Sequence, residues 1–421
     1  GGLGEGFSAF RGKWSSRPFH IEMSVEKEAS AHKTLELRAF YRQFHRTPAA
    51  YYDYLKGKLN REDLFSRYPV KAKKAREETL FGPKELGPGA GHDDLIHSRL
   101  RELKNNLDGL WLVIGGPPCQ AYSLVGRARN RGVAGYRAEK DKRHFLYEEY
   151  LKVLSEISPQ AFVMENVKGI LSSKVGGVHI FPRLLEDLRC PDQALGKENG
   201  PNSRYRIYSL VSGIEIDELT GSGRDCVIRT EEFGVPQSRH RVILLGVRED
   251  ITEQPGTLVR AEVQSNVGQM LSELPRLRSG LSKVTDSSET WAQAVSTEAR
   301  RVAAELQGHG LDPGVAIESA KKAASLRSRG GPFVVSKSKY RGPEHLSKWI
   351  PDNRLHGFAN HETRGHIQGD LGRYLYSACF AAQRDGESPR SQDFPASFAP
   401  KHKNWNSGKF ADRFKVQAAN K

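Results

Sequence analysis

The sequence is poor in cysteine, lacks long apolar runs, and has fewer acidic than basic residues. Its four cysteines among 421 residues are not closely paired, which does not suit a disulfide scaffold or a zinc ribbon. No apolar run approaches the roughly 20 residues of a membrane helix, and the chain opens on glycines instead of a basic-then-apolar leader. We therefore expect a cytoplasmic protein with no membrane partner and no metal.

The shortage of acidic residues is concentrated near the C-terminus. The chain has 65 Lys+Arg against 50 Asp+Glu, which gives a formal charge of +15. Residues 321–421 contain 19 Lys+Arg and 8 Asp+Glu, so this segment alone carries +11. A basic excess of this kind favours a polyanionic partner such as nucleic acid, although charge alone fits a solubilising surface equally well.

Apolar periodicity predicts alternating strands and helices up to about residue 250. This alternation favours a mostly parallel α/β sheet. After residue 248, Gly, Ser, Pro and Arg become frequent and strands are hard to find, so we place a domain boundary at residues 249–255. The expected strands are His20–Val25, Leu110–Ile114, Ala161–Met164, Tyr205–Val211 and Val242–Val247, and the expected helices are Glu28–Phe44, Asp94–Asn106 and Phe145–Ile157, with a helical insertion at about residues 45–91.

The most informative motif is Gly115-Gly116-Pro117-Pro118-Cys119-Gln120, directly after an expected buried strand. The two prolines restrict the backbone before Cys119 and hold its thiol at the carboxyl end of the sheet. Open α/β sheets bind their ligands at this edge. An isolated cysteine is more often a small buried apolar residue, but this context favours a reactive one.

Two further motifs lie at the edges of expected strands. Glu165-Asn166-Val167 ends one strand, where a buried carboxyl group could act as an acid. Gln237-Ser238-Arg239-His240-Arg241 precedes another, and alternation would turn the side chains of Gln237, Arg239 and Arg241 to one side. Taken separately, the first is typical of a strand-ending turn and the second of a solvated basic edge.

Together, and in this order, the three motifs resemble those of the DNA (cytosine-5)-methyltransferase family of bacterial type. The resemblance covers about residues 1–250. It implies a Rossmann-like sheet that uses S-adenosylmethionine, with residues 1–250 as the catalytic domain. Residues 251–421 would then form a second, smaller, irregular target-recognition domain.

The resemblance also implies a mechanism that agrees with these residue types. Cys119 would attack C6 of a cytosine flipped out of double-stranded DNA, while Glu165 contacts N3. Arg241 would bind the cytosine O2, with Arg239 nearby. The basic, glycine-containing loop at residues 121–142 could close over the base.

Further site residues are implied by the same resemblance. Glu26, 20 residues after Gly6, stands where an acidic residue binds the cofactor ribose in nucleotide-binding folds, and a surface glutamate is the alternative. Asp94 is a poor match to the family's contact with the adenine amine. The remaining implied cofactor contacts are Gly1, Gly2, Leu3, Pro117 and Leu146, and the implied substrate contacts are Gln120, Ser123, Asn166 and Gln237.

The sequence departs from the family pattern at both ends. Its first residues, Gly1–Phe7, resemble the tail of the family's cofactor motif without the Asp-x-Phe-x-Gly portion, and we read them as part of a loop. The family's late Gly-Asn-(Ala/Ser)-Val motif is not found either. We therefore expect a chain truncated at both ends, which would bind cofactor weakly or be inactive.

Four functional hypotheses follow from these observations. The first is a DNA cytosine-5 methyltransferase acting as a monomer in the bacterial cytoplasm, with a cognate restriction endonuclease as a functional partner. The second is an RNA cytosine-5 methyltransferase, which the long basic segment after Arg248 disfavours. The third is a catalytically incomplete nucleic-acid-binding fragment. The fourth, a cysteine hydrolase, is weakest, because neither His144 nor His240 lies in a motif typical of a catalytic base.

Overall fold

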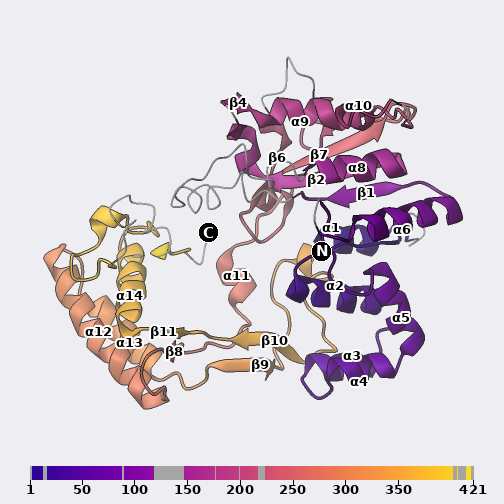
Figure 1. Ribbon diagram of the computed structural model, residues 1–421. Coiled ribbons are helices and arrows are strands. Elements are labelled where there is room, and N and C mark those ends of the chain that lie inside the picture. Colours follow the sequence, from indigo (N-terminus) through magenta and orange to yellow (C-terminus); the bar gives the residue numbers. More distant parts are fainter. Residues whose placement is uncertain are drawn as a thin grey trace. The chain divides into compact units, whose positions relative to one another are not determined.

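Two structural units make up the chain in the computed structural model (Figure 1). Unit 1 contains residues 1–47 and 65–264, and unit 2 contains residues 48–64 and 265–421. The segment 48–64 thus belongs with the C-terminal part of the chain. The structure describes residues 2–12, 17–87, 90–117, 147–175, 177–198, 200–216, 223–401, 405 and 414–418.

The centre of unit 1 is a mixed sheet with the strand order β1-β2-β7-β5, to which β6 adds by pairing with β7. β1 and β2 are parallel, whereas β7 is antiparallel to β2, β5 and β6. The α/β class is confirmed, but a single reversed strand makes the sheet less parallel than expected. Only ten residues connect β6 to β7, and a connection this short joins antiparallel strands. The strands are β1 (Leu112–Gly115), β2 (Ala161–Val167), β5 (Tyr205–Ser209), β6 (Val227–Arg229) and β7 (His240–Arg248), and a separate pair is formed by β3 (Lys174–Val175) and β4 (Val178–His179).

Helices cover this sheet through one large apolar core. From β2, Phe162 and Met164 enter the core together with buried leucines of α8 and α9. The ring of Phe162 packs directly against Gly246 of β7, and a Cβ on Gly246 would collide with this ring. The helices that complete this half of the unit are α8 (Tyr147–Ile157), α9 (Ile180–Arg189) and α10 (Pro191–Ala194).

The N-terminal part of unit 1 is helical, and two expectations for it are wrong. The glycine-rich opening forms a helix, α1, instead of a loop. Residues 20–25 are not a strand, because Ser24 gives its amide hydrogen to the carbonyl of Glu78 at the end of a helix, and not to a neighbouring strand. The expected helices at residues 28–44 and 94–106 and the helical insertion are confirmed. The helices here are α1 (Gly2–Ala9), α2 (Ala29–Arg42), α5 (Pro69–Glu78) and α6 (Asp93–Asn106), and the insertion also contains α3 (Ala49–Leu55) and α4 (Arg61–Ser66).

Unit 2 contains more regular structure than the sequence suggested. Its longest helix, α12, buries apolar residues three or four positions apart from Trp291 to Leu306, a pattern that the sequence analysis missed. Two small sheets, β8 with β11 and β9 with β10, accompany the helices. The elements are α11 (Val267–Leu271), β8 (Gly280–Leu281), α12 (Ser288–Gly308), α13 (Gly314–Ala324), β9 (Gly330–Val335), β10 (Gly357–Glu362), β11 (Gly365–His366) and α14 (Gln368–Ala382).

Among the residues that the structure describes, no helix is both long enough and apolar enough to cross a membrane.

Candidate active site

An ion pair between β2 and β7 forms the centre of the candidate site. Glu165 lies opposite Ile243, and Val167 lies opposite Arg241, so Glu165 and Arg241 are diagonal neighbours on one face of the sheet. The Nε of Arg241 lies 2.7 Å from Oε1 of Glu165, with the two side chains 20% and 33% exposed. Arg241 also donates to the carbonyl of His240 at 2.8 Å. The sheet register therefore brings together two residues that are 76 positions apart in the sequence.

The chain leaving β1 passes directly beside this pair. A Cβ added to Gly116 would lie 3.0 Å from Oε2 of Glu165 and 3.1 Å from its carbonyl oxygen, so the close approach favours glycine. A Cβ on Gly115 would lie 2.8 Å from the ring of Tyr150. Tyr150 fixes this edge from α8, since its hydroxyl lies 3.3 Å from the carbonyl of Val113 and 3.1 Å from that of Val163. Burial raises the pKa of Tyr150 well above its ordinary value, so it remains a neutral donor.

The motif residues that follow Gly116 are only partly covered by the structure. Pro117 is described and is half-buried. Cys119 comes three positions after Gly116 in the sequence, but it lies outside the described residues. The same holds for the other expected site residues in this part of the chain and at its start, which are Gln120, Ser123, Leu146 and Gly1.

The segment before β7 does not form the expected one-sided platform. The amide of Arg239 donates to the carbonyl of Gln237 at 2.9 Å, a tight turn that is incompatible with an extended backbone. It also donates to the hydroxyl of Thr230 at 3.0 Å. Gln237 and Arg239 are consequently exposed in a turn, and Arg241 alone of the three lies on the strand. The alternation argument was therefore wrong for Gln237 and Arg239.

Glu231 supports this turn from the other side. Its Oε1 accepts a hydrogen bond from Ser238 at 3.1 Å and lies 2.8 Å from Nε2 of His240. Burial acts to raise the pKa of Glu231, but the hydrogen bonds from His240 and Ser238 outweigh it, and the pKa lies below the ordinary value. Glu231 is thus a carboxylate that holds the turn before Arg241 in place, and no motif marks it in the sequence.

Asn166, between Glu165 and Val167, is buried. Its side-chain oxygen accepts a hydrogen bond from the amide of Val167 at 2.9 Å. Because successive residues of a strand alternate between faces, Asn166 lies on the opposite face of the sheet from Glu165. Its contact in the described structure is to the backbone, and its expected role in substrate binding stays a prediction.

Two of the expected cofactor residues, Gly2 and Leu3, belong to α1. A Cβ on Gly4 would lie 3.2 Å from Ile21 and 4.0 Å from Ile114 of β1, so this helix packs against the same strand that leads to Gly116. Around Gly2 and Gly6, in contrast, an added Cβ would meet no atom within 4 Å. Leu3 is half-buried in the same helix. The backbone at these two glycines is therefore open to approach by another group.

The two expected acidic cofactor contacts differ in their surroundings. The carboxylate of Glu26 accepts a hydrogen bond from the amide of Glu28 at 2.9 Å, just before α2. Glu26 therefore lies at a helix start and not at the end of a strand as expected. Asp94 is exposed in the first turn of α6. Within the described chain, no hydrogen bond or ion pair joins either residue to the Glu165–Arg241 pair.

A buried charge network that the sequence analysis missed holds α1 in place. Glu5 of α1 pairs with Arg38 and Arg42 of α2, and Arg42 also lies 2.5 Å from Glu78 of α5. Glu78 is only 7% exposed, and this burial raises its pKa to about 7 although Arg42 acts to lower it. Arg42 thus connects the glycine-rich segment, through Glu5, to Glu78 of α5, and Glu78 is the carboxyl group with the unusual affinity for protons.

Comparison with known proteins finds a family similarity in part of the chain. Residues 91–190 match the family model described as C-5 cytosine-specific DNA methylase. This match contains Gly116 and Glu165 as well as the Cys119 motif. No group of three or more His, Cys, Asp or Glu that could hold a metal occurs among the residues covered by the structure.

Three relatives show how far the similarity extends. A type II methyltransferase of Bacillus paralicheniformis, M.Bpa9945I, is 32% identical over 299 residues, which are 66% of this chain and 59% of the relative. The type II methyltransferase M.DdeI of Desulfomicrobium norvegicum is 29% identical over 42% of this chain and 36% of its own. The DNA (cytosine-5-)-methyltransferase M.ApeKI of Aeropyrum pernix is 31% identical over 33% of this chain and 27% of its own. The chain thus spans less than two thirds of the length of these relatives.

A solved structure proposed to be a DNA modification methyltransferase from a prophage of E. coli also matches. It covers 45% of this chain and 42% of its own, at 18% identity and a TM-score of 0.26. A score this low carries no argument about the site.

Proposed function

We propose that the chain transfers a methyl group from S-adenosylmethionine to C5 of cytosine in double-stranded DNA. The observation that carries this proposal is the ion pair of Glu165 and Arg241 beside Gly116, three residues before Cys119. This arrangement supplies a carboxyl group and a fixed cation beside Gly116, and the sequence places the potential nucleophile Cys119 three positions later. The match of residues 91–190 to the C-5 cytosine-specific DNA methylase model and the names of the relatives support the choice of cytosine in DNA.

In the proposed reaction, the thiolate of Cys119 forms a bond to C6 of the flipped-out cytosine. Glu165, in its protonated form, would donate a proton to N3 and so neutralise the negative charge that this attack pushes into the ring, while Arg241 would hold the cytosine O2. S-adenosylmethionine supplies the methyl group that C5 accepts. Loss of the C5 proton to a base and cleavage of the bond from Cys119 to C6 then restore the aromatic ring and the thiolate.

The cofactor would be held by the residues around α1. The open glycines Gly2 and Gly6, with Leu3, would receive it, and Glu26 would contact the ribose if its carboxylate exchanges the bond to Glu28. Asp94, Pro117 and Leu146 complete the proposed contacts. Unit 2 would contribute target recognition to the catalytic unit 1.

The biological setting is proposed from the relatives. Since two of them are named type II methyltransferases, we propose that the chain acts in a restriction–modification system with a cognate endonuclease. We propose further that it works as a monomer in the bacterial cytoplasm and needs no metal.

A methyl-transfer assay with a Cys119→Ser variant tests the proposal. Unmethylated bacterial DNA and an RNA transcript of equal length would be incubated with radiolabelled S-adenosylmethionine and the 421-residue chain. At a high concentration of S-adenosylmethionine, which offsets the weak cofactor binding expected from the sequence, we expect label in DNA with the unaltered chain, no label with Cys119→Ser, and similar DNA binding by both. Label in RNA alone would replace DNA with RNA as the substrate, and absence of label from both would favour a binding protein without activity.

The covalent step has a separate test. In DNA that contains 5-fluorocytosine, fluorine replaces the proton that C5 must lose. The adduct between Cys119 and the base then cannot be released, and it should survive denaturing gel electrophoresis. We expect this adduct with the unaltered chain and not with Cys119→Ser. Label transfer without a trapped adduct would overturn the covalent mechanism while leaving methyl transfer in place.

A further inference from the structure

A two-stranded ribbon in unit 2 carries a long loop at its end. Strands β9 and β10 pair antiparallel from Gly330 opposite Glu362 to Val335 opposite Gly357. Residues 336–356 connect the two strands. The loop therefore begins and ends at the same point of a regular ribbon.

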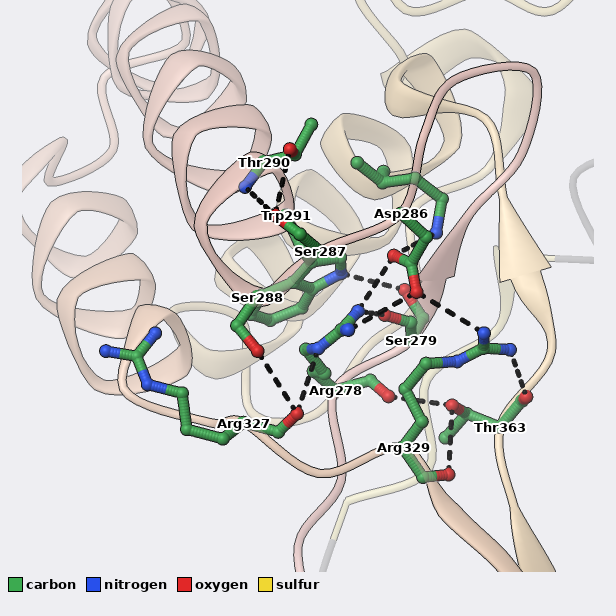
Figure 2. Close-up of polar contacts among 11 residues, drawn as sticks. Arg278, Ser279, Asp286, Ser287, Ser288, Thr290, Trp291, Arg327, Arg329 and Thr363 are labelled. Carbon is green, nitrogen blue, oxygen red and sulfur yellow. Dashed lines mark hydrogen bonds and ion pairs between the residues drawn. The ribbon is translucent and has the colours of Figure 1, made fainter.

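The other end of the ribbon is fixed by a buried polar cluster (Figure 2). Arg278, with 7% of its side chain exposed, binds both carboxylate oxygens of Asp286 at 2.9 and 3.3 Å. Asp286 also binds Arg329, and Arg329 donates to the carbonyl of Thr363 at 3.0 Å. Since Arg329 precedes β9 and Thr363 follows β10, the cluster holds both strands at their base. The ribbon is thus a supported element on which the loop is mounted.

The loop itself is folded by contacts of its own. Leu346 is buried, and its carbonyl accepts hydrogen bonds from the amides of Trp349 at 2.9 Å and Ile350 at 3.0 Å. The ring of Tyr340 lies against Gly342, and its hydroxyl donates to the carbonyl of Pro343 at 3.1 Å. These contacts define a compact turn instead of an open connection.

Contacts with α3 fix the second half of the loop. The hydroxyl of Tyr52 donates to Asp352 at 2.7 Å, and the guanidinium of Arg354 lies 4.9 Å from the centre of the Tyr52 ring. Residues 48–64 share unit 2 with the loop, which explains why this early segment belongs with the C-terminal part of the chain. The loop is held on both sides of its turn.

This well-supported turn leaves large apolar side chains uncovered. Trp349 is 64% exposed, and Ile350 beside it is 48% exposed. Solvent exposure of two adjacent large apolar residues on an ordered turn is unfavourable unless a partner covers them. Their position is therefore better explained by binding than by folding.

The charge of the loop indicates which partner this is. Residues 336–356 contain five Lys+Arg against two Asp+Glu, a net of +3. The basic residues Lys337, Lys339, Arg341 and Lys348 are exposed. An aromatic side chain among exposed cations suits nucleic acid, because the cations bind phosphates while the ring stacks on a base or enters a base step.

We propose that Trp349, assisted by Ile350, is a base-contacting residue of unit 2 that stacks on or between bases of double-stranded DNA. The lysines and Arg341 of the same loop hold the flanking phosphates. This inference rests on the proposed function, in which unit 2 recognises DNA, and it names the residue that does so. An apolar contact of this kind adds affinity without releasing counterions, whereas each lysine contact makes binding more dependent on salt.

Binding of the 421-residue chain to fluorescent 30-base-pair duplexes with a randomised centre tests this. We expect Trp349→Ala to weaken binding about 10- to 100-fold with an unchanged salt slope, and Trp349→Phe to retain most of the affinity. The double variant Lys337→Gln, Lys339→Gln should instead lower the slope by about 1.8. Leu110→Ala, which removes an 85% exposed side chain from unit 1, is the matched control and should bind normally.

Two further measurements make the outcome decisive. Sequencing of the bound duplexes should show an altered base preference for Trp349→Ala, and thermal denaturation should show that this variant is folded. Equal affinity and preference for Trp349→Ala and Leu110→Ala would overturn the inference. If the unaltered chain binds DNA but transfers no methyl group, the proposed activity fails while the Trp349 test still stands.

Discussion

Two arginine–carboxylate pairs in this protein have the same chemistry but different surroundings. The pair of Arg241 and Glu165 lies at a sheet edge, with side chains 20% and 33% exposed, and Arg241 has one further hydrogen bond, to the carbonyl of His240. In the pair of Arg278 and Asp286 the arginine is 7% exposed, and all its nitrogens are bonded. An ion pair with free bonding capacity can bind substrate, whereas one with none left can only hold the fold together.

The contrast predicts a large loss of stability from Asp286→Ala. This variant leaves Arg278 as a buried charge without its partner, which typically costs about 3–5 kcal/mol. We expect a markedly lower unfolding temperature by calorimetry. Glu318→Ala removes the exposed pair with Lys321 and serves as the control, with little change expected. Equal stability of the two variants would show that the Arg278–Asp286 pair does not hold unit 2 together.

Glu165→Gln should show the opposite behaviour. The amide keeps the shape of the side chain but cannot act as an acid, so we expect a methylation rate lower by roughly 10²- to 10³-fold. Duplex affinity and unfolding temperature should change little. Glu249→Gln, which alters an exposed pair with Arg204 outside the site, is the control. A loss of stability comparable to that of Asp286→Ala would remove the distinction between the two pairs.

The Glu78 network adds a pH-dependent case. Folding raises the pKa of Glu78 from 4.5 to about 7, so the folded state binds its proton more tightly than the unfolded state. The resulting stabilisation is complete below about pH 4.5 and is lost as the pH rises through 7, a change of about 3 kcal/mol. Denaturant titrations from pH 4.5 to 8 should show this decline, and Glu78→Gln should flatten it. The neighbouring Glu77→Gln should leave the decline unchanged, and persistence of the full decline in Glu78→Gln would assign it to another group.

The smallest expected effect is a difference between Arg327 and Arg329 in how each contributes to the salt dependence of DNA binding. The side chain of Arg329 is bonded to Asp286 and to the carbonyl of Thr363. Arg327 contacts the cluster through its backbone carbonyl, which accepts a hydrogen bond from Arg278. Figure 2 shows the side chain of Arg327 directed away from the cluster. We expect Arg327→Gln to lower the salt slope of DNA binding by about 0.9 with no loss of stability. Arg329→Gln should lower stability and leave the slope unchanged. Equal slopes for Arg327→Gln and the unaltered chain would mean that Arg327 is solvated surface.

The sequence determined those features that depend on local pattern. Apolar runs gave the strands at β2 and β7, because buried strands need continuous apolar residues on both faces. The motif around Glu165 could be placed at the end of β2 for the same reason. Helices α2 and α6 were equally visible from their periodicity. The family resemblance also lay in short contiguous motifs, and those around Cys119 and Glu165 fall within the match over residues 91–190.

Features that depend on partners distant in sequence could not be read in this way. A tight turn decided that Gln237 and Arg239 leave the strand, since hydrogen bonds to Thr230 replaced the alternation. Residues 20–25 have a strand-like pattern, but the amide of Ser24 donates to the carbonyl of Glu78 at the end of a helix instead. The burial of Glu78 likewise depends on where α5 packs against α2.

The tertiary structure decided above all which of many similar residues are free to act. Arg241 was marked by its motif, but Arg278, Arg327 and Arg329 cannot be ranked from the sequence, because each is an arginine in a polar context. Only the packing of distant segments shows that Arg278 and Arg329 are bound within the protein. The same packing leaves Arg241 at an open edge beside Gly116. A charge acts on a substrate only where folding has not already satisfied it, and this depends on every segment that folding brings near it.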